Sequence, residues 1–436
     1  MRTRCVEIAL LIGKGQGAAS NADPGWESEA MIMSGAIVDP LQMPNTITVG
    51  GSEADIQGYH SRALQMAVDA ARARGGGVVR IDKGVFDISS PLRLYDHVAL
   101  VGAGEGTILR KSDGYRSKFV VDADYGELKV VAVSSHGFEA GMGIQIYDAN
   151  STDWLISTAV ITAVEDHVIH FDKHLIQDYS SDQNGVLSSA CSVIEGIQVE
   201  GAEIRNLAID GNGGNNDRMN GCRGGGIYFH KAKNCVVEDV KIANFNGDGV
   251  SLQIVEDMTV KNCEIKGCLN YGLHPGTGAL RAVVEGCDVH DNGSDGMYVC
   301  WRVRRGWFVN NRIYRNGGNG VNIGHKDEGN VFADNHVFEN GNCGIHVRAE
   351  KESNGSHRNK YLRNLIENNG NNDRGFGILI RGITTGTVIE GNTIRDTGAG
   401  RQKVGIFLDE GVSDTQLRGN RLSGHSEGDL STPRHL

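Results

Sequence analysis

The sequence predicts an all-β fold, a parallel β-helix, from a fixed repeat, the strand pattern inside it and a column of Asn. One short unit recurs between Gly247 and Lys351. Its reference glycines, which are 23 or 24 residues apart, are Gly249, Gly272, Gly296, Gly320 and Gly344. A period of this size is typical of a solenoid, in which identical units stack to build a continuous core.

Each reference glycine is followed by the alternation of a strand with one buried face. In the first copy, Val250 and Leu252 are apolar and Ser251 between them is polar. Two further apolar segments follow in each unit, as at Val260 and Ile265. Three short strands per unit predict a β-helix, because the leucine framework and helical segment of a leucine-rich repeat are absent.

A second column supports the same register. The residue two positions before the third-strand aliphatic is Val240, Cys263, Cys287, Asn311, Asn335, Asn364, Asn392 and Asn420. Stacked Asn side chains at a bend can satisfy backbone groups and each other's amides. We interpret Cys263 and Cys287 as packing residues that continue this column, rather than as metal ligands.

The repeat pattern divides the chain. We expect a loosely ordered N-terminal segment (1–45), a capping helix with the first coils (46–115), a β-rich insertion (116–190), the main β-helix (191–425) and a mobile tail (426–436). The helix is predicted over 59–74, with Leu64, Ala67, Val68 and Ala71 at helical spacing before a run of glycines. A helix there would cap the open end of the solenoid.

Composition limits the partners. The net charge of −11 argues against nucleic acid, and the apolar runs are too short to span a membrane. The nine cysteines are scattered without a CxxC pair, which predicts neither a disulfide framework nor a zinc site.

We expect no cofactor, because calcium-binding repeats and EF-hand loops are absent; calcium held by scattered carboxylates is the open alternative. We expect a monomer. The start of the chain is not a convincing signal peptide, because Glu7 precedes an apolar run that is short.

Outward side chains of successive coils should line a groove. Two residues after the reference glycine stand Tyr228, Ser251, His274, Tyr298, Asn322 and His346; four after it stand His230, Gln253, Gly276, Cys300, Gly324, Arg348, Arg381 and Asp409. The strand ends add Trp301, Arg302, His325, Lys326, Asp327, Glu350 and Lys351. Five coils span roughly 24 Å at about 4.8 Å per strand, which suits several sugar units. The alternative is an ordinary polar face that only contacts solvent. We favour a functional groove, because exposing the large aromatic side chains of Trp301 and Tyr298 to water is costly unless they serve a purpose.

Two stretches resemble known families. Asp55, the helix, the GGGVV run and Lys83-Gly-Val-Phe resemble the opening of right-handed β-helix proteins of the pectate-lyase superfamily. The segments NYGLHPGTG, VHDNGSDGMYV and FVNNRIYRNGGNGVNI resemble the catalytic module of mannuronan C5-epimerases. The family's tyrosine and proline fall on Tyr271 and Pro275, whereas His274, Gly276 and Cys300 stand where the family has Asp, His and Asp. The resemblance implies a right-handed β-helix, a site near these residues, and a secreted or periplasmic location.

Three functions remain open: a lyase or epimerase that abstracts the C5 proton of a uronate, a glycoside hydrolase, and a non-catalytic binding or tailspike-like solenoid. The first needs a cation, a base and an acid. We predict as catalytic Tyr271, His274, His325, Lys326, His346 and Arg348, and as substrate-binding Tyr298, Trp301, Arg302, Asp327, Glu350, Lys351 and Arg381.

A hydrolase would instead need two carboxyl groups about 5–9 Å apart. The candidates are Asp248, Asp295, Asp327, Glu350 and Asp409. Asp248 and Asp295 directly precede reference glycines, where Asp is commonly a turn residue. We favour the lyase or epimerase, acting on a polysaccharide or oligosaccharide, because the predicted groove is richer in His, Arg and Lys than in paired acids.

Overall fold

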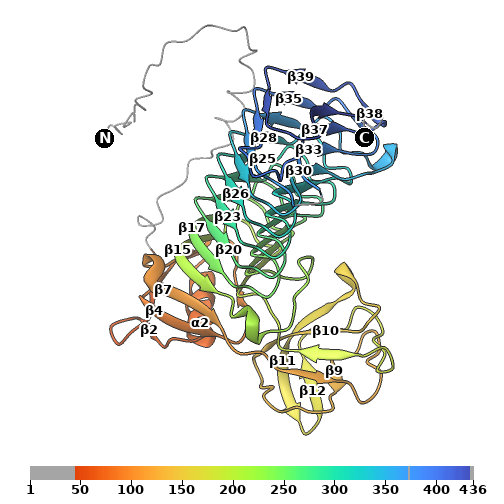
Figure 1. The fold of residues 1–436 in the computed structure, drawn as a ribbon. Coiled ribbons are helices and arrows are strands. Elements are labelled where there is room, and N and C mark those ends of the chain that lie inside the picture. Colours follow the sequence, from red (N-terminus) through yellow and green to blue (C-terminus); the bar gives the residue numbers. More distant parts are fainter. Residues whose placement is uncertain (1–44, 372–373, 433–436) are drawn as a thin grey trace, which may run out of the picture. The chain divides into compact units, whose positions relative to one another are not determined.

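A computed structural model describes residues 45–371 and 374–432, which form a parallel β-helix with a β-rich insertion (Figure 1). Equivalent strands of successive coils pair in parallel and in register. Figure 1 shows β17 (Val236–Ala243), β20 (Glu264–Lys266), β23 (Asp288–His290) and β26 (Arg312–Tyr314) following one another along the stack. The predicted fold class is confirmed.

The first strand of each coil belongs to a sheet that has 11 strands within the described ranges. These strands are β5 (Leu92–Arg93), β14 (Ile194–Ile197), β16 (Ile227–His230), β18 (Val250–Gln253), β21 (Leu273–Pro275), β24 (Met297–Val299), β27 (Val321–Ile323), β30 (Cys343–Val347), β33 (Phe376–Ile380), β37 (Val404–Leu408) and β41 (Gly428–Ser431). We call it the 11-stranded sheet. Its inward residues, such as Val250 and Leu252, are buried in the core.

The other two strands of each coil form the opposite walls. The second strands are β19 (Thr259–Lys261), β22 (Val283–Glu285), β25 (Trp307–Val309), β28 (Val331–Ala333), β31 (Lys360–Leu362), β35 (Val388–Glu390) and β39 (Gln416–Arg418). The third strands, after β20, β23 and β26, are β29 (His336–Phe338), β32 (Leu365–Glu367), β36 (Thr393–Arg395) and β40 (Arg421–Ser423). β15 (Glu203–Asp210) and β17 span both positions, and β34 (Thr384–Thr385) pairs with β38 (Val412–Ser413) outside these walls.

Close packing explains the reference glycines. A Cβ on Gly249 would overlap the Ile265 side chain, and a Cβ on Gly272 would overlap Val289. The third-strand aliphatic thus fills the space that a side chain at the glycine would need. The period of the repeat is therefore a packing requirement of the coil interior.

The predicted Asn column is confirmed as a ladder of hydrogen bonds. The Nδ2 of Asn311 donates to Oδ1 of Asn335 (3.0 Å), which also accepts the backbone N–H of Asn311 (2.9 Å). The same pairing continues through Asn364 and Asn392. Cys287 joins this column as predicted, since its backbone N–H donates to Oδ1 of Asn311 and its thiol is buried.

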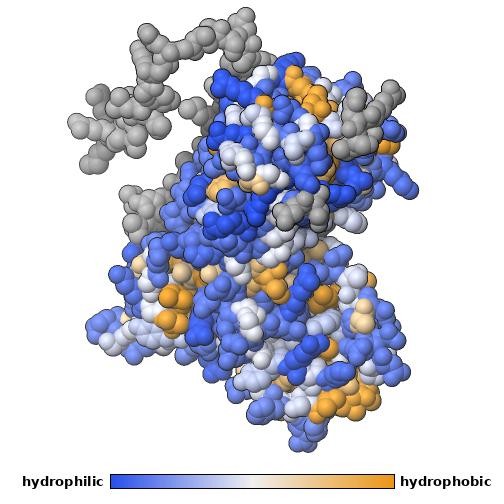
Figure 2. Space-filling model, viewed as in Figure 1, coloured by the Kyte–Doolittle hydropathy of each residue, from blue (hydrophilic) through white to orange (hydrophobic). Residues whose placement is uncertain are grey.

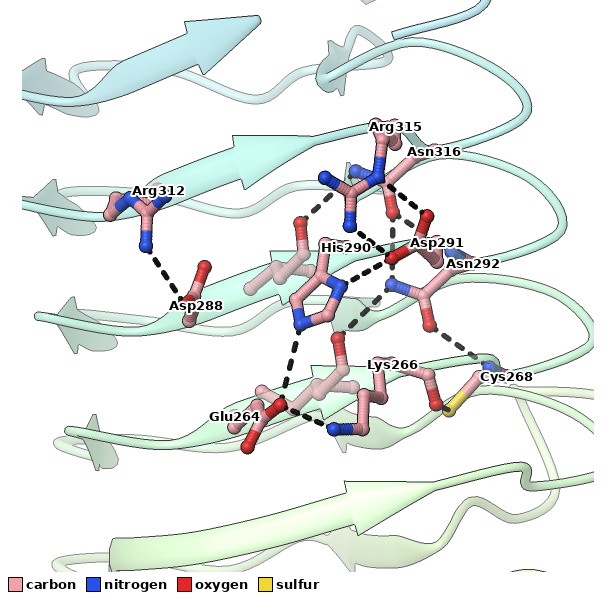
Figure 3. A network of polar contacts seen from close by, with 12 residues as sticks. Glu264, Lys266, Cys268, Asp288, His290, Asp291, Asn292, Arg312, Arg315 and Asn316 are labelled. Carbon is pink, nitrogen blue, oxygen red and sulfur yellow. Dashed lines mark hydrogen bonds and ion pairs between the residues drawn. The ribbon is translucent and has the colours of Figure 1, made fainter. Parts of the chain in front are cut away.

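A second ladder was not predicted. It consists of Cys268, Asn292, Asn316, Asn340, Asn369 and Gln402, each linked to the next by side-chain oxygens. Figure 3 shows part of it beside an outer face where Arg315 makes a paired contact with Asp291 at 2.9 and 2.7 Å. Arg315 holds the pKa of Asp291 low, at about 2. This outer face is thus tied from coil to coil by ion pairs.

The N-terminal end carries the predicted cap. The helix α2 (Ser61–Ala73) buries Leu64, Ala67, Val68 and Ala71 as expected, with Ala63 in addition. It lies against the first coils, which contain β1 (Thr46–Gly50), β2 (Ile56–Gln57), β3 (Gly77–Ile81), β4 (Gly84–Ile88), β6 (Val98–Val101) and β7 (Thr107–Lys111). The helix covers the core of the first coil from solvent.

The insertion is an antiparallel sheet in the order β8-β13-β10-β11-β12-β9. Its strands are β8 (Arg116–Lys118), β9 (Lys129–Val131), β10 (Gly143–Tyr147), β11 (Ser157–Glu165), β12 (Val168–Phe171) and β13 (Val186–Ser188). It has its own apolar core, which includes Ile144, Ile146 and Tyr179. Exposed apolar residues such as Val120 and Val133 also occur here. The face in Figure 2 is mainly hydrophilic, with several separate hydrophobic patches.

Two expectations about the chain ends have different outcomes. The predicted tail from residue 426 is wrong in part, because Gly428–Ser431 forms β41 and pairs in parallel with β37. The predicted loose segment 1–45 lies outside the described residues, apart from Asn45. In the part of the chain that the structure describes, no helix combines the length and apolar character needed to cross a membrane.

Candidate functional site

The outward columns lie where the repeat predicts. In the 11-stranded sheet, Ser251 is in register with His274, and Asn322 is in register with both Tyr298 and His346. The backbone at Gly276 bridges to Cys300 in the four-residue column. Side chains from separate coils are thus brought together on one face.

The best-defined polar contact on this face joins Asp248 to His274. The His274 Nδ1 lies 2.7 Å from the Asp248 Oδ2, and both side chains are buried. The other carboxylate oxygen, Oδ1, accepts from the Asn270 amide (2.6 Å) and from the Tyr271 backbone N–H (3.3 Å). A carboxylate on Nδ1 orients the ring and leaves Nε2 for another partner, as in catalytic dyads.

Two tyrosines pack against this histidine. The Tyr271 and Tyr298 rings are stacked, with centroids 4.2 Å apart and planes 8° apart. The His274 ring meets both of them nearly edge-on, at 5.5 and 5.3 Å. Burial raises the pKa of Tyr271 and of Tyr298, so both phenols stay protonated at neutral pH. We call Asp248, Tyr271, His274 and Tyr298 the dyad cluster.

Arg348 supplies a positive charge at its edge. The Arg348 Cζ lies 4.8 Å from the centroid of the Tyr298 ring. Its Nη1 donates to Asn322 Oδ1 (2.9 Å) and its Nη2 to the Val299 carbonyl (3.0 Å). These bonds fix the guanidinium and leave some of its five N–H groups for a ligand.

A second group lies at the carboxyl ends of the strands. The Trp301 and His325 rings stack at 4.0 Å, and His325 Nδ1 lies 3.3 Å from Glu350 Oε1. Trp301 is 46% exposed, and the neighbouring Arg302, Lys326 and Lys351 are also exposed. We call Trp301, His325 and Glu350 the rim cluster. The rim cluster lies past the end of β24, whereas Tyr298 of the dyad cluster lies within it.

Not every predicted residue is close to the dyad. His346 stands three coils from His274, or about 14 Å at the usual strand spacing, so the two rings do not contact each other. Burial, together with Arg348, Arg381 and Arg374, lowers the pKa of His346 to about 4. Its Nε2 is buried without a hydrogen-bond partner among the described residues.

The prediction that Asp327 contacts substrate is wrong. Its side chain is fully buried, and it accepts the backbone N–H groups of Val303 (2.8 Å) and Gly324 (2.9 Å). Burial raises the pKa of this carboxyl well above its ordinary range. Asp327 therefore holds a turn beneath the rim, where it also lies 3.5 Å from Arg348.

Sequence reasoning missed the role of Asp248 as the partner of His274. It considered Asp248 only as a turn residue or a hydrolase carboxylate. A signal was available, because Asp248 stands one before its reference glycine and His274 stands two after the next one. Asp295 and Asn322 occupy the same positions two repeats further along the stack, and they are also bonded, at 2.8 Å.

Metal binding gains no support from the described residues. Among them, no three His, Cys, Asp or Glu side chains are grouped so that they could hold an ion. At the position where the epimerase-like motif would have Asp, burial raises the pKa of the Cys300 thiol to about 11. This thiol is thus neutral at physiological pH.

Solved structures with the same architecture include mannuronan epimerases. The A-module of the Azotobacter vinelandii mannuronan C-5 epimerase AlgE6 aligns with a TM-score of 0.56 and 18% identity, over 86% of this chain and 91% of that chain. The AlgE4 A-module from the same organism gives 0.55 and 18%, over 85% and 93%. The Dettilon tailspike protein gp208 gives 0.51 and 12%, over 85% and 64%. At these identities the likeness shows the fold alone.

Sequence comparison identifies the family. Curated proteins contain no match to this sequence. The family model described as a right handed beta helix region matches residues 140–361, slightly more than half of the chain. This match indicates that the coil described above is right-handed, and the chain belongs to the right-handed β-helix family.

Proposed function

We propose that this protein is a polysaccharide-active enzyme that abstracts the C5 proton of a uronate residue, with elimination or epimerisation as the outcome. The observation that carries the proposal is the hydrogen bond from His274 to the buried Asp248, beside two protonated tyrosines. A base and two possible acids then lie beside one another on the same face. The likeness to epimerase A-modules, which concerns the fold, agrees with this choice.

The roles follow from protonation. With Nδ1 donating to Asp248, the Nε2 of His274 has a lone pair and takes the C5 proton. For elimination, the electrons of the C5–H bond form a C4–C5 double bond, and the C4–O bond breaks. A tyrosine phenol, Tyr271 or Tyr298, gives its proton to the leaving oxygen. For epimerisation, the tyrosine returns a proton to the opposite face of C5 and the chain stays intact.

Positive charge lowers the barrier to C5 deprotonation, because the carboxylate gains electron density as the proton leaves. Arg348 lies at the dyad cluster and is fixed by Asn322 and Val299. Arg302, Lys326, Lys351 and Arg381 are exposed nearby and suit the carboxylates of neighbouring sugars. The stacked Trp301 and His325 provide a flat surface for a sugar face.

Hydrolysis has weaker support from the same residues. Asp327 is buried beneath backbone N–H groups, and Asp295 accepts bonds from Asn319 and Asn322. The Asp248 carboxylate is hydrogen-bonded to the His274 ring, the Asn270 amide and the Tyr271 backbone N–H. These three candidate carboxylates thus serve hydrogen bonds inside the protein rather than a water or a glycosidic oxygen.

An activity screen tests the proposal. Mannuronan, polygalacturonate and neutral glucans are incubated with the protein, and the unsaturated product is followed by ultraviolet absorbance alongside a reducing-end assay. Solvent deuterium incorporation at C5, read by NMR, detects epimerisation. We expect an ultraviolet or deuterium signal on a uronate polymer, and its loss in His274→Gln. New reducing ends without either signal would show hydrolysis and contradict the proposal.

A further inference from the structure

The outward face of the 11-stranded sheet differs on the two sides of His274. On the N-terminal side, Tyr228 is 3% exposed, and Ser251 and Gln253 are fully buried. These residues point away from the core of the coil, so other parts of the chain must cover them. On the C-terminal side, Tyr298 and His346 are partly exposed, and the Arg381 side chain is 49% exposed.

The covering segments are residues 217–226 and the turn Asp153–Leu155, which we call the cover. The Tyr228 hydroxyl donates to the Cys222 carbonyl (2.9 Å), and the Ser251 hydroxyl donates to the Gly221 carbonyl (2.5 Å). The Trp154 ring packs on His230, with centroids 5.5 Å apart. The cover thus occupies the sheet surface that a sugar chain would otherwise cross.

The cover is fixed to the insertion rather than loosely laid on the sheet. The Gln145 amide donates to the Arg218 carbonyl (2.8 Å), and the Tyr147 hydroxyl lies 2.5 Å from Asp217 Oδ2. Arg218 in turn donates to Asn270 Oδ1 (3.3 Å), next to the dyad cluster. These contacts join the insertion, the cover and the site in one network.

The cover ends at the dyad itself. A Cβ on Gly221 would overlap the Asp248 carboxylate and lie 2.8 Å from His274 Nδ1. Glycine is therefore needed where the cover meets the hydrogen bond between these two side chains. From His274 the sheet continues over four strand spacings, or about 19 Å, to Arg381; Tyr298, His346 and Arg381 are partly or fully exposed along it, whereas Asn322 and Leu379 are buried.

We infer that the site acts on the terminal residues of an anionic polysaccharide, because the cover closes the groove immediately beyond His274. This inference rests on the proposed function and specifies where on the polymer it occurs. A chain bound along the path from Arg381 has its end at the cover. Each elimination there removes a short unit by the same proton transfers, and no internal bond is cut.

The first experiment compares product formation with viscosity during turnover of mannuronan or polygalacturonate. With attack at the end, unsaturated product accumulates while viscosity falls only slowly. Random internal cleavage lowers viscosity several-fold before much product has formed, and that result would overturn the inference. If the reaction is epimerisation, NMR should place the deuterium in terminal residues first, and an even distribution would be the contrary result.

A pair of variants tests the cover. Trp154→Ala removes the ring that packs on His230, and we expect the products to shift several-fold toward internal cleavage. Leu155→Ala is the matched control, since this residue is in the same turn but 45% exposed. The double variant Trp154→Ala/Tyr147→Phe removes a second contact of the cover. If its fold is intact by circular dichroism and its product pattern is unchanged, the cover does not set the position of attack.

A binding measurement separates this inference from the proposed chemistry. Saturation-transfer NMR with hexasaccharides of mannuronate and of galacturonate reports which sugar protons touch the protein. We expect the strongest transfer at one terminal residue. That result without turnover of any polymer would overturn the proposed chemistry but keep the terminal binding. Uniform transfer along the chain, or no binding of either hexasaccharide, would overturn the inference.

Discussion

The Nδ1 of His274 lies 2.7 Å from the Oδ2 of Asp248, and the two residues belong to neighbouring coils. The same positions of the repeat join Asp295 to Asn322 at 2.8 Å. The β-helix thus has a recurring contact between a carboxylate before one glycine and a side chain after a later one. Where one partner is an imidazole, this structural contact fixes the orientation of the ring.

Asp248→Asn should impair the reaction with little change of shape. An amide cannot hold the same tautomer of His274, so we expect kcat/KM to fall on the order of 10²–10⁴-fold. Asp295→Asn is the matched control, because it alters the equivalent contact to Asn322. Both variants should lose stability in thermal unfolding. Equal activity of the two would show that the histidine contact is only structural.

Tyr271→Phe and Tyr298→Phe should differ from each other. Each keeps its ring and therefore the 4.2 Å stack, but removes one hydroxyl. The variant that lacks the proton donor should lose roughly 10²–10⁴-fold in kcat, and the other should retain most activity. Steady-state kinetics on the uronate polymer measures both. Full activity in the two single variants would exclude the tyrosines as acids.

Stability should fall in mildly acidic solution because of His346. Its pKa is about 4 in the folded protein and 6.5 when unperturbed. The unfolded chain therefore binds the proton more readily, and folding weakens as the pH falls from about 6.5 to about 4. The loss attributable to this ring is at most about 3 kcal/mol.

Urea unfolding between pH 4 and pH 7 measures this dependence. His346→Gln should flatten the slope. A slope that persists in His346→Gln would assign the acid sensitivity to other groups. His230 is one of them, because burial and the nearby Lys231 and Arg223 lower its pKa to about 4 as well.

The Asn ladder should be necessary for stability. Asn335→Ala leaves the buried backbone N–H and side-chain amide of Asn311 without their acceptor, together with the Phe308 carbonyl without its donor. Each unpaired buried group costs about 1–3 kcal/mol. Thermal unfolding should show a clearly lower midpoint than for Asn342→Ala, which alters an exposed side chain. Similar midpoints would show that the ladder adds little.

Binding of an anionic polymer should depend on salt through the exposed cations near the rim cluster. The double variant Lys326→Ala and Lys351→Ala should raise KM several-fold at low ionic strength, with little change in kcat. The difference should shrink as salt screens the charges. Lys360→Ala, on the exposed face of β31, is the control. A KM that is independent of both lysines would mean that the polymer lies elsewhere.

The sequence by itself determined the coil. Gly249 and its successors, the aliphatic strands and the Asn311–Asn335 column all depend on equivalent positions meeting in the next coil, which a constant period guarantees. The same logic correctly placed His274, Tyr298 and Arg348 on one face. The second ladder from Cys268 to Gln402 follows the same rule and could have been found in the same way.

Only the tertiary structure decided how deep each outward residue lies and what covers it. Asp327 was expected at the surface, but backbone N–H groups surround it. The cover depends on contacts such as Tyr147 with Asp217, between segments 70 residues apart in different parts of the fold. A repeat fixes neighbours along its own column, whereas insertions follow no period. Their docking depends on side-chain packing between distant segments, and it is this docking that covers Tyr228 and Ser251 on the outer face of the 11-stranded sheet.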